Sequence, residues 1–225
     1  MLGGAFEAER EAHFRPLNLT WIMPAQERHS RETSRFQPSI SLLHPEGEFI
    51  MTDSKTSVMV ETAVVLALAL ALSQLRIFRA PQGGSVTLVM VPLFILAFRR
   101  GARAGMIAGA LFGLLRLTLD AFVVHWIQFL LDYSVAFALL GVAGFFRDRP
   151  TLGMGIGVLG RFICHFIAGM VFFAAYAPEG TPVVVYSLAY NASFLIPEAI
   201  ISLLAVPAVA RRLPGATGVF KQQTG

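Results

Sequence analysis

The chain has 225 residues, of which 55% are hydrophobic and only 14% are charged, against roughly 25% charged residues in ordinary soluble domains. Together with a mean hydropathy of +0.64, this composition excludes a soluble domain and indicates an integral membrane protein. The formal net charge is +4, and the one cysteine, Cys164, excludes an internal disulfide.

The first 50 residues differ from the rest of the chain. They contain seven glutamates and five arginines among scattered proline, serine and glutamine. Met1 to Arg15 is acidic and interrupted, unlike the basic and then apolar start of a signal peptide. We predict that residues 1–55 form a disordered N-terminal tail. Met51 begins a short polar segment directly before the first apolar stretch. We therefore consider it an alternative translation start.

Six apolar stretches of membrane-spanning length follow this tail. They cover residues 56–78, 86–98, 101–119, 129–147, 150–176 and 183–210. A helix needs about 20 residues to cross a bilayer, so the second stretch is short and we expect it to be tilted, partly irregular or begun within Gln82–Ser85. The predicted fold is all-α: a six-helix membrane domain over 56–211, followed by a short cytoplasmic tail over 212–225.

Lysine and arginine in the short loops predict the orientation. An even number of spans puts both termini on one side, and that side also carries most of the basic residues, whereas the other side has Arg76 and Arg79. The positive-inside rule therefore places both termini in the cytoplasm. The basic character of the chain follows from this topology, and we expect no nucleic-acid partner. The basic residues on the side that carries both termini are Lys55, Arg99, Arg100, Arg103, Arg147, Arg149, Arg211, Arg212 and Lys221.

Two ridges of small residues predict close helix packing. In the third span a glycine recurs at every fourth position, and alanines do the same in the first span. Packing within the bundle is the simpler interpretation of each ridge. The alternative is that one ridge faces lipid and docks another membrane subunit. The glycine ridge is Gly101, Gly105, Gly109 and Gly113, and the alanine ridge is Ala63, Ala67 and Ala71.

Polar and aromatic side chains gather in the outer halves of spans four to six. They include Asp132, Tyr133, His165, Tyr186 and Asn191. A carboxylate, an imidazole, a carboxamide and aromatic rings together suit a flat, hydrogen-bonding and cationic heterocycle in an outward-facing pocket. Tyrosines near an interface also serve as membrane-belt residues, and a histidine also forms helix–helix hydrogen bonds. Asn191 is harder to explain by packing, because a carboxamide in hydrocarbon needs several partners.

Three further charges lie inside the spans. Arg161 and Glu198 are at similar depths in adjacent spans, and we predict an ion pair that lowers the cost of burying each charge. Arg116 has two interpretations: it pairs with Asp120 one turn later, or it competes with a ligand cation for Asp132.

Several long segments resemble one known family. VTLVMVPLFILAFRRGARAG (86–105), HWIQFLLDYSVAFALLGVAG (125–144) and RFICHFIAGMVFFAAYAPEGTPVVVYSLAYNASFLIPEAII (161–201) are similar to the thiamine-specific substrate-binding component, ThiT type, of energy-coupling-factor transporters. The resemblance runs from about Glu61 to Arg211. It includes the APEG loop and the YSLxYN and IPE elements in the same order.

The resemblance implies a set of thiamine-binding residues. By position these are Asp132, Tyr133, His165, Tyr186 and Asn191, joined by Phe173 and Phe122 where the family has a stacking tryptophan and a loop tyrosine. The family carboxylate is often a glutamate. Phenylalanine attracts a cation more weakly than tryptophan does, so a thiamine precursor or related heterocycle stays an alternative ligand. The loop Arg79–Ser85 has the glycines expected of a lid.

The same resemblance implies the partners. In that family a transmembrane coupling protein and two cytoplasmic ATPases supply the energy, and the ridge of Ala63, Ala67 and Ala71 matches the docking surface. This chain has no phosphate loop, and we expect neither an enzyme nor a cofactor or metal site. A standalone ion-coupled secondary transporter and a sensor that binds a vitamin without moving it are the other functions considered.

Overall fold

The structure is a computed structural model that describes residues 55–119 and 121–213. The predicted N-terminal tail, apart from Lys55, lies outside the described residues, as does the alternative start at Met51. Asp120 and most of the predicted C-terminal tail also lie outside them.

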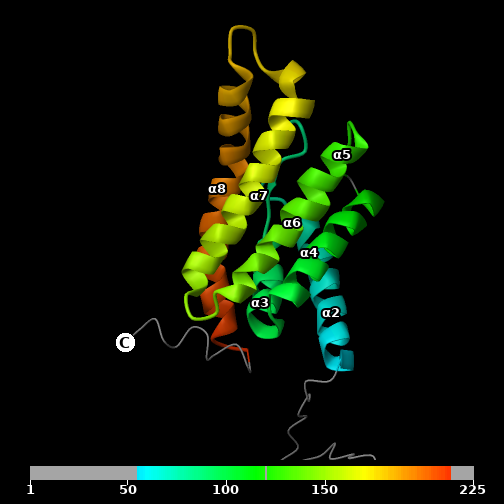
Figure 1. Cartoon of the computed structure of the whole chain (residues 1–225), viewed down its shortest axis with the longest axis vertical. Coiled ribbons are helices and arrows are strands. Elements are labelled where there is room, and N and C mark those ends of the chain that lie inside the picture. The colour runs from blue at the N-terminus through cyan, green and yellow to red at the C-terminus, as the bar shows by residue number, and fades with distance from the viewer. Residues whose placement is uncertain (1–54, 120, 214–225) are drawn as a thin grey trace, which may run out of the picture. The chain divides into compact units, whose positions relative to one another are not determined.

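Six helical segments make up the described chain, as Figure 1 shows. The fourth segment is built from four consecutive helical pieces, and 3₁₀ turns follow α4 and α7 (η2, Arg116–Thr118; η5, Ala174–Tyr176). This arrangement confirms the predicted all-α membrane fold. The segments are α2 (Lys55–Gln74), α3 (Met90–Arg100), α4 (Ala102–Leu115), the fourth span (α5 Trp126–Phe129, η3 Leu130–Val135, α6 Ala136–Leu140 and η4 Gly141–Phe145), α7 (Pro150–Phe172) and α8 (Val183–Ala210).

Four of the six segments are long and apolar enough to cross a membrane by themselves. These are α2, the fourth span over Trp126–Phe145, α7 and α8. The two others are shorter, since α3 has 11 residues and α4 has 14. A helix of 14 residues rises only about 21 Å, so the chain on either side of α3 and α4 completes their passage through the bilayer.

The second predicted span is partly irregular, which is one of the outcomes expected from its short length, because it begins with a hairpin and not with a helix. Strand β1 (Phe78–Arg79) pairs antiparallel with β2 (Ser85–Val86), and the amide of Ala80 donates to the carbonyl of Gly84 at 2.7 Å. Gly83 supplies the turn with a φ of 90°, which glycine adopts without strain. The first predicted span therefore ends at Gln74 and not at residue 78, and the second is helical only from Met90.

The glycine ridge packs inside the bundle, as its simpler interpretation predicts. A methyl group on Gly105, Gly109 or Gly113 would overlap the backbone of the fourth span, and at Gly109 it would lie 2.1 Å from the carbonyl oxygen of Phe137. Each turn of α4 thus lies directly against the fourth span. The alanine ridge differs, because Ala63, Ala67 and Ala71 are all exposed along α2.

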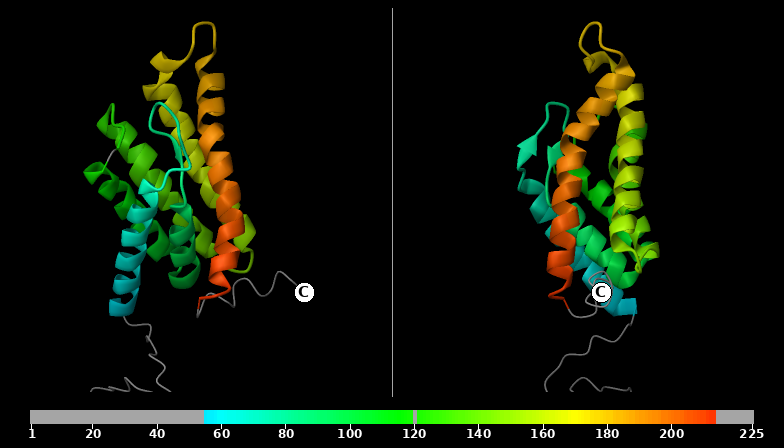
Figure 2. Two further views of the ribbon diagram at one scale, coloured as in Figure 1. Left: turned by 180° about the vertical axis from the view of Figure 1, so that it is seen from behind. Right: turned by 90° about the vertical axis from the view of Figure 1, so that its left-hand side faces the viewer.

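Both ends of the described chain lie at the same end of the helix bundle, as Figures 1 and 2 show for the start of α2 and the end of α8. The arginine-rich turns after α3 and before α7 lie at this end too. The Glu61 carboxylate accepts hydrogen bonds from Arg99 and Arg100 there, which ties α2 to α3. The hairpin lies toward the other end (Figure 2).

We expect Gly109→Ala to lower the thermal unfolding temperature of the detergent-purified protein by several degrees. Because its methyl group would overlap the Phe137 carbonyl, the two helices must separate, and overpacking of this kind costs about 1–3 kcal/mol. Gly155→Ala in α7 is the matched control, since a methyl group there meets nothing within 4 Å. Equal unfolding temperatures for the two variants would contradict the close packing of α4 on the fourth span.

Candidate substrate-binding site

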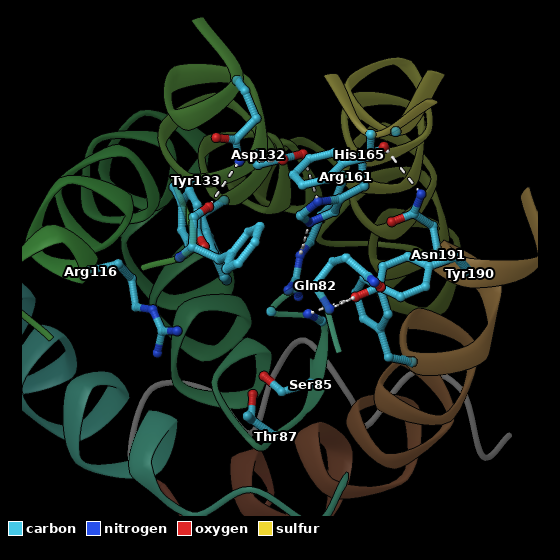
Figure 3. A pocket seen from close by; sticks show the side chains of 18 of the residues that line it. Gln82, Ser85, Thr87, Arg116, Asp132, Tyr133, Arg161, His165, Tyr190 and Asn191 are labelled. Atoms are coloured by element: carbon cyan, nitrogen blue, oxygen red, sulfur yellow. Dashed lines mark hydrogen bonds and ion pairs between the residues drawn. The ribbon is translucent and has the colours of Figure 1, made fainter. Parts of the chain in front are cut away.

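A pocket opens between the hairpin, the fourth span, α7 and α8, and Figure 3 shows it from close by. It lies toward the end of the bundle opposite the two termini of the described chain. All seven residues that the sequence and the resemblance singled out for binding line it: Phe122, Asp132, Tyr133, His165, Phe173, Tyr186 and Asn191. They come from three spans and one loop, so only the tertiary structure brings them together.

Asp132 lies in a π-helical stretch of the fourth span, η3, which also carries Tyr133. Single π turns widen a helix locally and are frequent at functional sites. Asp132 is 7% exposed. One carboxylate oxygen accepts from Gln128 Nε2 at 2.8 Å, and the other lies 2.9 Å from Nδ1 of His165. The carboxylate is therefore held in place before any ligand arrives.

Gln128 is a site residue that the sequence reasoning missed. It is 1% exposed and contacts three groups, since its amide oxygen also accepts from the amide of Val124 at 3.2 Å and its Nε2 also donates to the carbonyl of Phe122 at 3.3 Å. It thereby joins the loop before the fourth span to Asp132. The signal was present in the sequence, because Gln128 precedes Asp132 by four residues, the spacing at which helical side chains meet.

Arg161 and Glu198 form the predicted ion pair, with Arg161 Nη1 2.9 Å from Glu198 Oε2. The other Glu198 oxygen accepts from the hydroxyl of Thr87 at 2.6 Å. Arg161 Nε also points to Nε2 of His165 at 3.4 Å. One continuous polar network thus runs from the segment after the hairpin, through α8 and α7, to the carboxylate of Asp132. Figure 3 shows its part from Arg161 through His165 to Asp132.

Asn191 has the several partners that a buried carboxamide requires. Its Nδ2 donates to the carbonyls of Ser187 and His165 at 2.9 and 3.2 Å, and it lies 3.3 Å from the Ser187 hydroxyl. These contacts bridge α7 and α8, which approach so closely that a methyl group on Gly169 would lie 2.1 Å from that hydroxyl. Asn191 therefore also has a structural role in the wall of the pocket.

Aromatic rings form two other parts of the wall. The rings of Phe122 and Phe173 lie 6.1 Å apart at an angle of 31°, and those of Tyr186 and Tyr190 stack at 5.9 Å. The hydroxyl of Tyr133 accepts from the amide of Phe122 at 2.9 Å, which holds the loop that carries Phe122. Phe122 and Phe173, two of the three positions where this chain departs from the family pattern, are thus neighbours.

Tyr190 fastens the hairpin over the pocket. Its hydroxyl accepts from the backbone amides of Gln82 and Gly84 at 3.1 and 3.2 Å, as the dashed lines in Figure 3 show. Gly84 packs so tightly that a methyl group there would lie 2.6 Å from the ring of Phe194. The backbone of the hairpin region therefore finds its partners in protein at the pocket, which is where irregular backbone is tolerated in membrane proteins.

Comparison with known proteins places this chain in a family. Residues 59–217 match the model of the thiamine transporter protein family Thia_YuaJ. The chain is 40% identical over 171 residues to the thiamine transporter ThiT of Bacillus subtilis, covering 67% of this chain and 89% of that protein. It is 31% identical over 169 residues to the thiamine transporter ThiT of Lacticaseibacillus paracasei, covering 66% of this chain and 84% of that protein.

A solved structure agrees with these sequence relatives. ThiT from Listeria monocytogenes superposes with a TM-score of 0.65 at 27% identity, covering 72% of this chain and 96% of that chain. The match confirms the predicted resemblance and the multi-pass membrane fold. It also confirms the expectation of a non-enzymatic role, since the family's activity is transport. The chain belongs to the thiamine transporter protein family, whose model runs from residue 59, within α2, to beyond the end of α8.

Proposed function

We propose that the pocket binds thiamine from outside the cell. The observation that carries this proposal is the buried, pre-positioned carboxylate of Asp132 among aromatic rings, in a chain whose relatives in Bacillus subtilis and Lacticaseibacillus paracasei are named thiamine transporters. Thiamine joins a positively charged thiazolium ring to an aminopyrimidine. The pocket offers a negative charge for the first and hydrogen-bonding groups for the second.

Charge and ring faces support the thiazolium part of this assignment. Asp132 carries its carboxylate into a pocket that is screened from bulk water, where a charge pair is stronger than at a free surface. The faces of Phe173 and Tyr133 lie in the same pocket, and aromatic faces attract cations. The ligand cation would then exchange water for one carboxylate and two rings.

The edge of the aminopyrimidine requires directed hydrogen bonds. Tyr186 and Asn191 come from α8 and offer a phenol and a carboxamide, and His165 of α7 lies beside them with its two ring nitrogens facing Asp132 and Arg161. The contacts that fix Asn191 between Ser187 and His165 reduce the entropy lost when a ligand binds. These three residues therefore form a rigid surface for reading a flat heterocycle.

Titration calorimetry of thiamine into the purified protein tests the assignment. We expect tight binding by the parent protein and binding weakened by about tenfold or more in Asp132→Asn, because that variant keeps the shape of the side chain and loses its charge. Glu179→Gln, in the exposed loop before α8, removes one negative charge at the same end and should bind as the parent does. No binding by a folded parent would reject thiamine, and thiamine precursors would be titrated next.

The hairpin acts as the lid of this pocket in our proposal. Gln82, Gly83, Gly84 and Ser85 all line the pocket, and Tyr190 fastens their backbone through a single hydroxyl. Opening the lid would break those two hydrogen bonds and withdraw the loop from Phe194 and Phe122.

We expect Tyr190→Phe to speed amide hydrogen exchange at Gln82 and Gly84 severalfold, because the acceptor for both amides is removed while the ring stays. Mass spectrometry of peptides that cover residues 78–89 measures this exchange. Tyr186→Phe, the same change one helical turn earlier, is the matched control and should leave exchange in the hairpin unchanged. Unaltered exchange in Tyr190→Phe would show that other contacts hold the lid.

We also propose that the chain is the substrate-binding component of an energy-coupling-factor importer. A transmembrane coupling protein and two cytoplasmic ATPases would then supply the energy, as the family resemblance implies. The exposed ridge of Ala63, Ala67 and Ala71 supports this assembly, because small residues on a lipid-facing surface let another helix approach closely. Val60, Val64 and Leu68 are exposed along the same helix.

Ala67→Trp tests the docking surface. We expect it to abolish thiamine uptake and co-purification with the coupling protein while leaving thiamine binding unchanged, because the indole prevents close approach on α2 and lies away from the pocket. Leu159→Trp is the control, since Leu159 is 57% exposed on α7 and adds the same indole to a different lipid-facing surface. Loss of binding in Ala67→Trp, or equal loss of uptake in both variants, would overturn the assignment.

A further inference from the structure

Arg161 is fixed on three sides inside the bundle. Its Nη1 pairs with Glu198 at 2.9 Å, its guanidinium carbon lies 4.3 Å from the centre of the Phe137 ring, and its Nε–H points at His165 Nε2 at 3.4 Å. The residue is 5% exposed. A guanidinium is always protonated and has donors only, so whatever faces its Nε must be an acceptor.

This geometry decides where the proton of His165 lies. Because Arg161 donates to Nε2, that nitrogen must carry a lone pair, so the proton of a neutral imidazole is on Nδ1. Nδ1 faces the Asp132 carboxylate at 2.9 Å and donates to it. A second proton on Nε2 would face the Arg161 N–H group directly and would have no acceptor there.

We propose that Arg161 is a positioning residue that holds His165 as the neutral Nδ1–H tautomer, so that Asp132 keeps its full negative charge for a cationic ligand. If His165 became an imidazolium, it would neutralise Asp132 within the pocket and compete with the ligand cation. The ligand part of this inference rests on the proposed thiamine function. The tautomer part rests on the geometry of the polar network alone.

Glu198 and Thr87 serve the same arrangement indirectly. Glu198 is fully buried and cancels the charge of Arg161, so the pair adds no net charge to the pocket wall. Thr87 donates to the second oxygen of Glu198 at 2.6 Å. This hydrogen bond fixes the orientation of the carboxylate that pairs with Arg161. The ion pair thus orients His165 without itself repelling a cation.

The other ionisable groups near His165 come from the end of α4, the fourth span, α7 and α8. Phenols and thiols ordinarily keep their protons at neutral pH, so the charged groups that act on His165 are the two carboxylates and the two guanidinium groups. Among the described residues the set is Arg116 beside α4, Asp132 and Tyr133 from the fourth span, Arg161 and Cys164 from α7, and Tyr186, Tyr190 and Glu198 from α8.

The test removes the guanidinium without leaving a buried charge unpaired. Breaking one partner of a buried ion pair costs about 3–5 kcal/mol, whereas replacing both partners is often neutral. The variant is therefore R161M/E198Q, in which the methionine side chain fills the volume without a donor and the glutamine oxygen still accepts from Thr87. Thr87→Val is the control, because it perturbs the same network and leaves Arg161 facing His165.

Nitrogen NMR of histidine-labelled protein at pH 6.5 without ligand reads the tautomer, with the His165 signal assigned from a His165→Gln variant. We expect one protonated and one unprotonated ring nitrogen in the parent and in Thr87→Val. In R161M/E198Q we expect protonation of both nitrogens or exchange between the tautomers. Identical His165 signals in the parent and in R161M/E198Q would overturn the proposal, and so would a parent with both nitrogens protonated.

Ligand selectivity supplies the second measurement. The ratio of affinities for thiamine and for its uncharged thiophene analogue reports how much negative charge the pocket presents. We expect this ratio to fall about tenfold in R161M/E198Q and to stay unchanged in Thr87→Val. An unchanged ratio in R161M/E198Q would show that Arg161 does not preserve the negative charge of Asp132 for the ligand, and would overturn that part of the proposal. A parent that binds neither compound would reject the thiamine function while the NMR result still decides the tautomer.

Discussion

The burial of charge inside a membrane is the constraint on which the rest of this structure depends. Each ionised side chain inside a membrane is costly, and this bundle holds Asp132, Arg161 and Glu198 within its spans, each buried. Their costs are offset because they belong to one hydrogen-bonded network that also contains His165 and Thr87. Four segments of the chain must therefore meet in one arrangement for any of these charges to be tolerated.

The same constraint explains the irregular backbone around the pocket. The hairpin before α3 and the π turn of the fourth span both depart from regular α-helix, and both line the pocket. Backbone amides in hydrocarbon need partners inside the protein. Tyr190 supplies one for Gln82 and Gly84, so the residue that fastens the proposed lid also satisfies its polar groups.

The packing of α4 against the fourth span also positions the pocket. The glycines of α4 let the fourth span approach until backbone meets backbone, and the last of these contacts, from Gly113, reaches Tyr133 and Ser134. Tyr133 directly follows Asp132 in the sequence. The small residues of α4 thereby set the depth at which the carboxylate enters the pocket. The alanines of α2 face outward, which fits the docking that we propose for this ridge.

Prediction from sequence succeeded where the signal was local. Hydropathy determined the six spans because a helix must be apolar over most of its length to cross a bilayer. Spacing along the helices predicted that Arg161 and Glu198 lie at the same depth, and their ion pair is observed. The i, i+4 spacing of Gln128 and Asp132 carries equivalent information, but a glutamine has no charge, and its burial inside a span is therefore a weaker signal of a site.

The boundaries of the second span were not readable in the same way. Residues from Val86 onward are as apolar as a helix, yet the chain runs through a hairpin before Met90. Its regular structure is interrupted because Thr87 donates to Glu198 and Tyr190 binds the hairpin backbone. Those partners lie more than 100 residues away, so no local pattern could reveal them.

The sequence by itself therefore determined the membrane class, the number of spans, the family resemblance and the residue types of the pocket, because these follow from composition, hydropathy and motifs along the chain. Only the tertiary structure decided which ridge of small residues packs and which is exposed, and which groups face the two ring nitrogens of His165. Those outcomes depend on distances between side chains from different helices, such as Arg161, His165 and Asp132. Distances of this kind are set only when the helices pack together in the folded bundle.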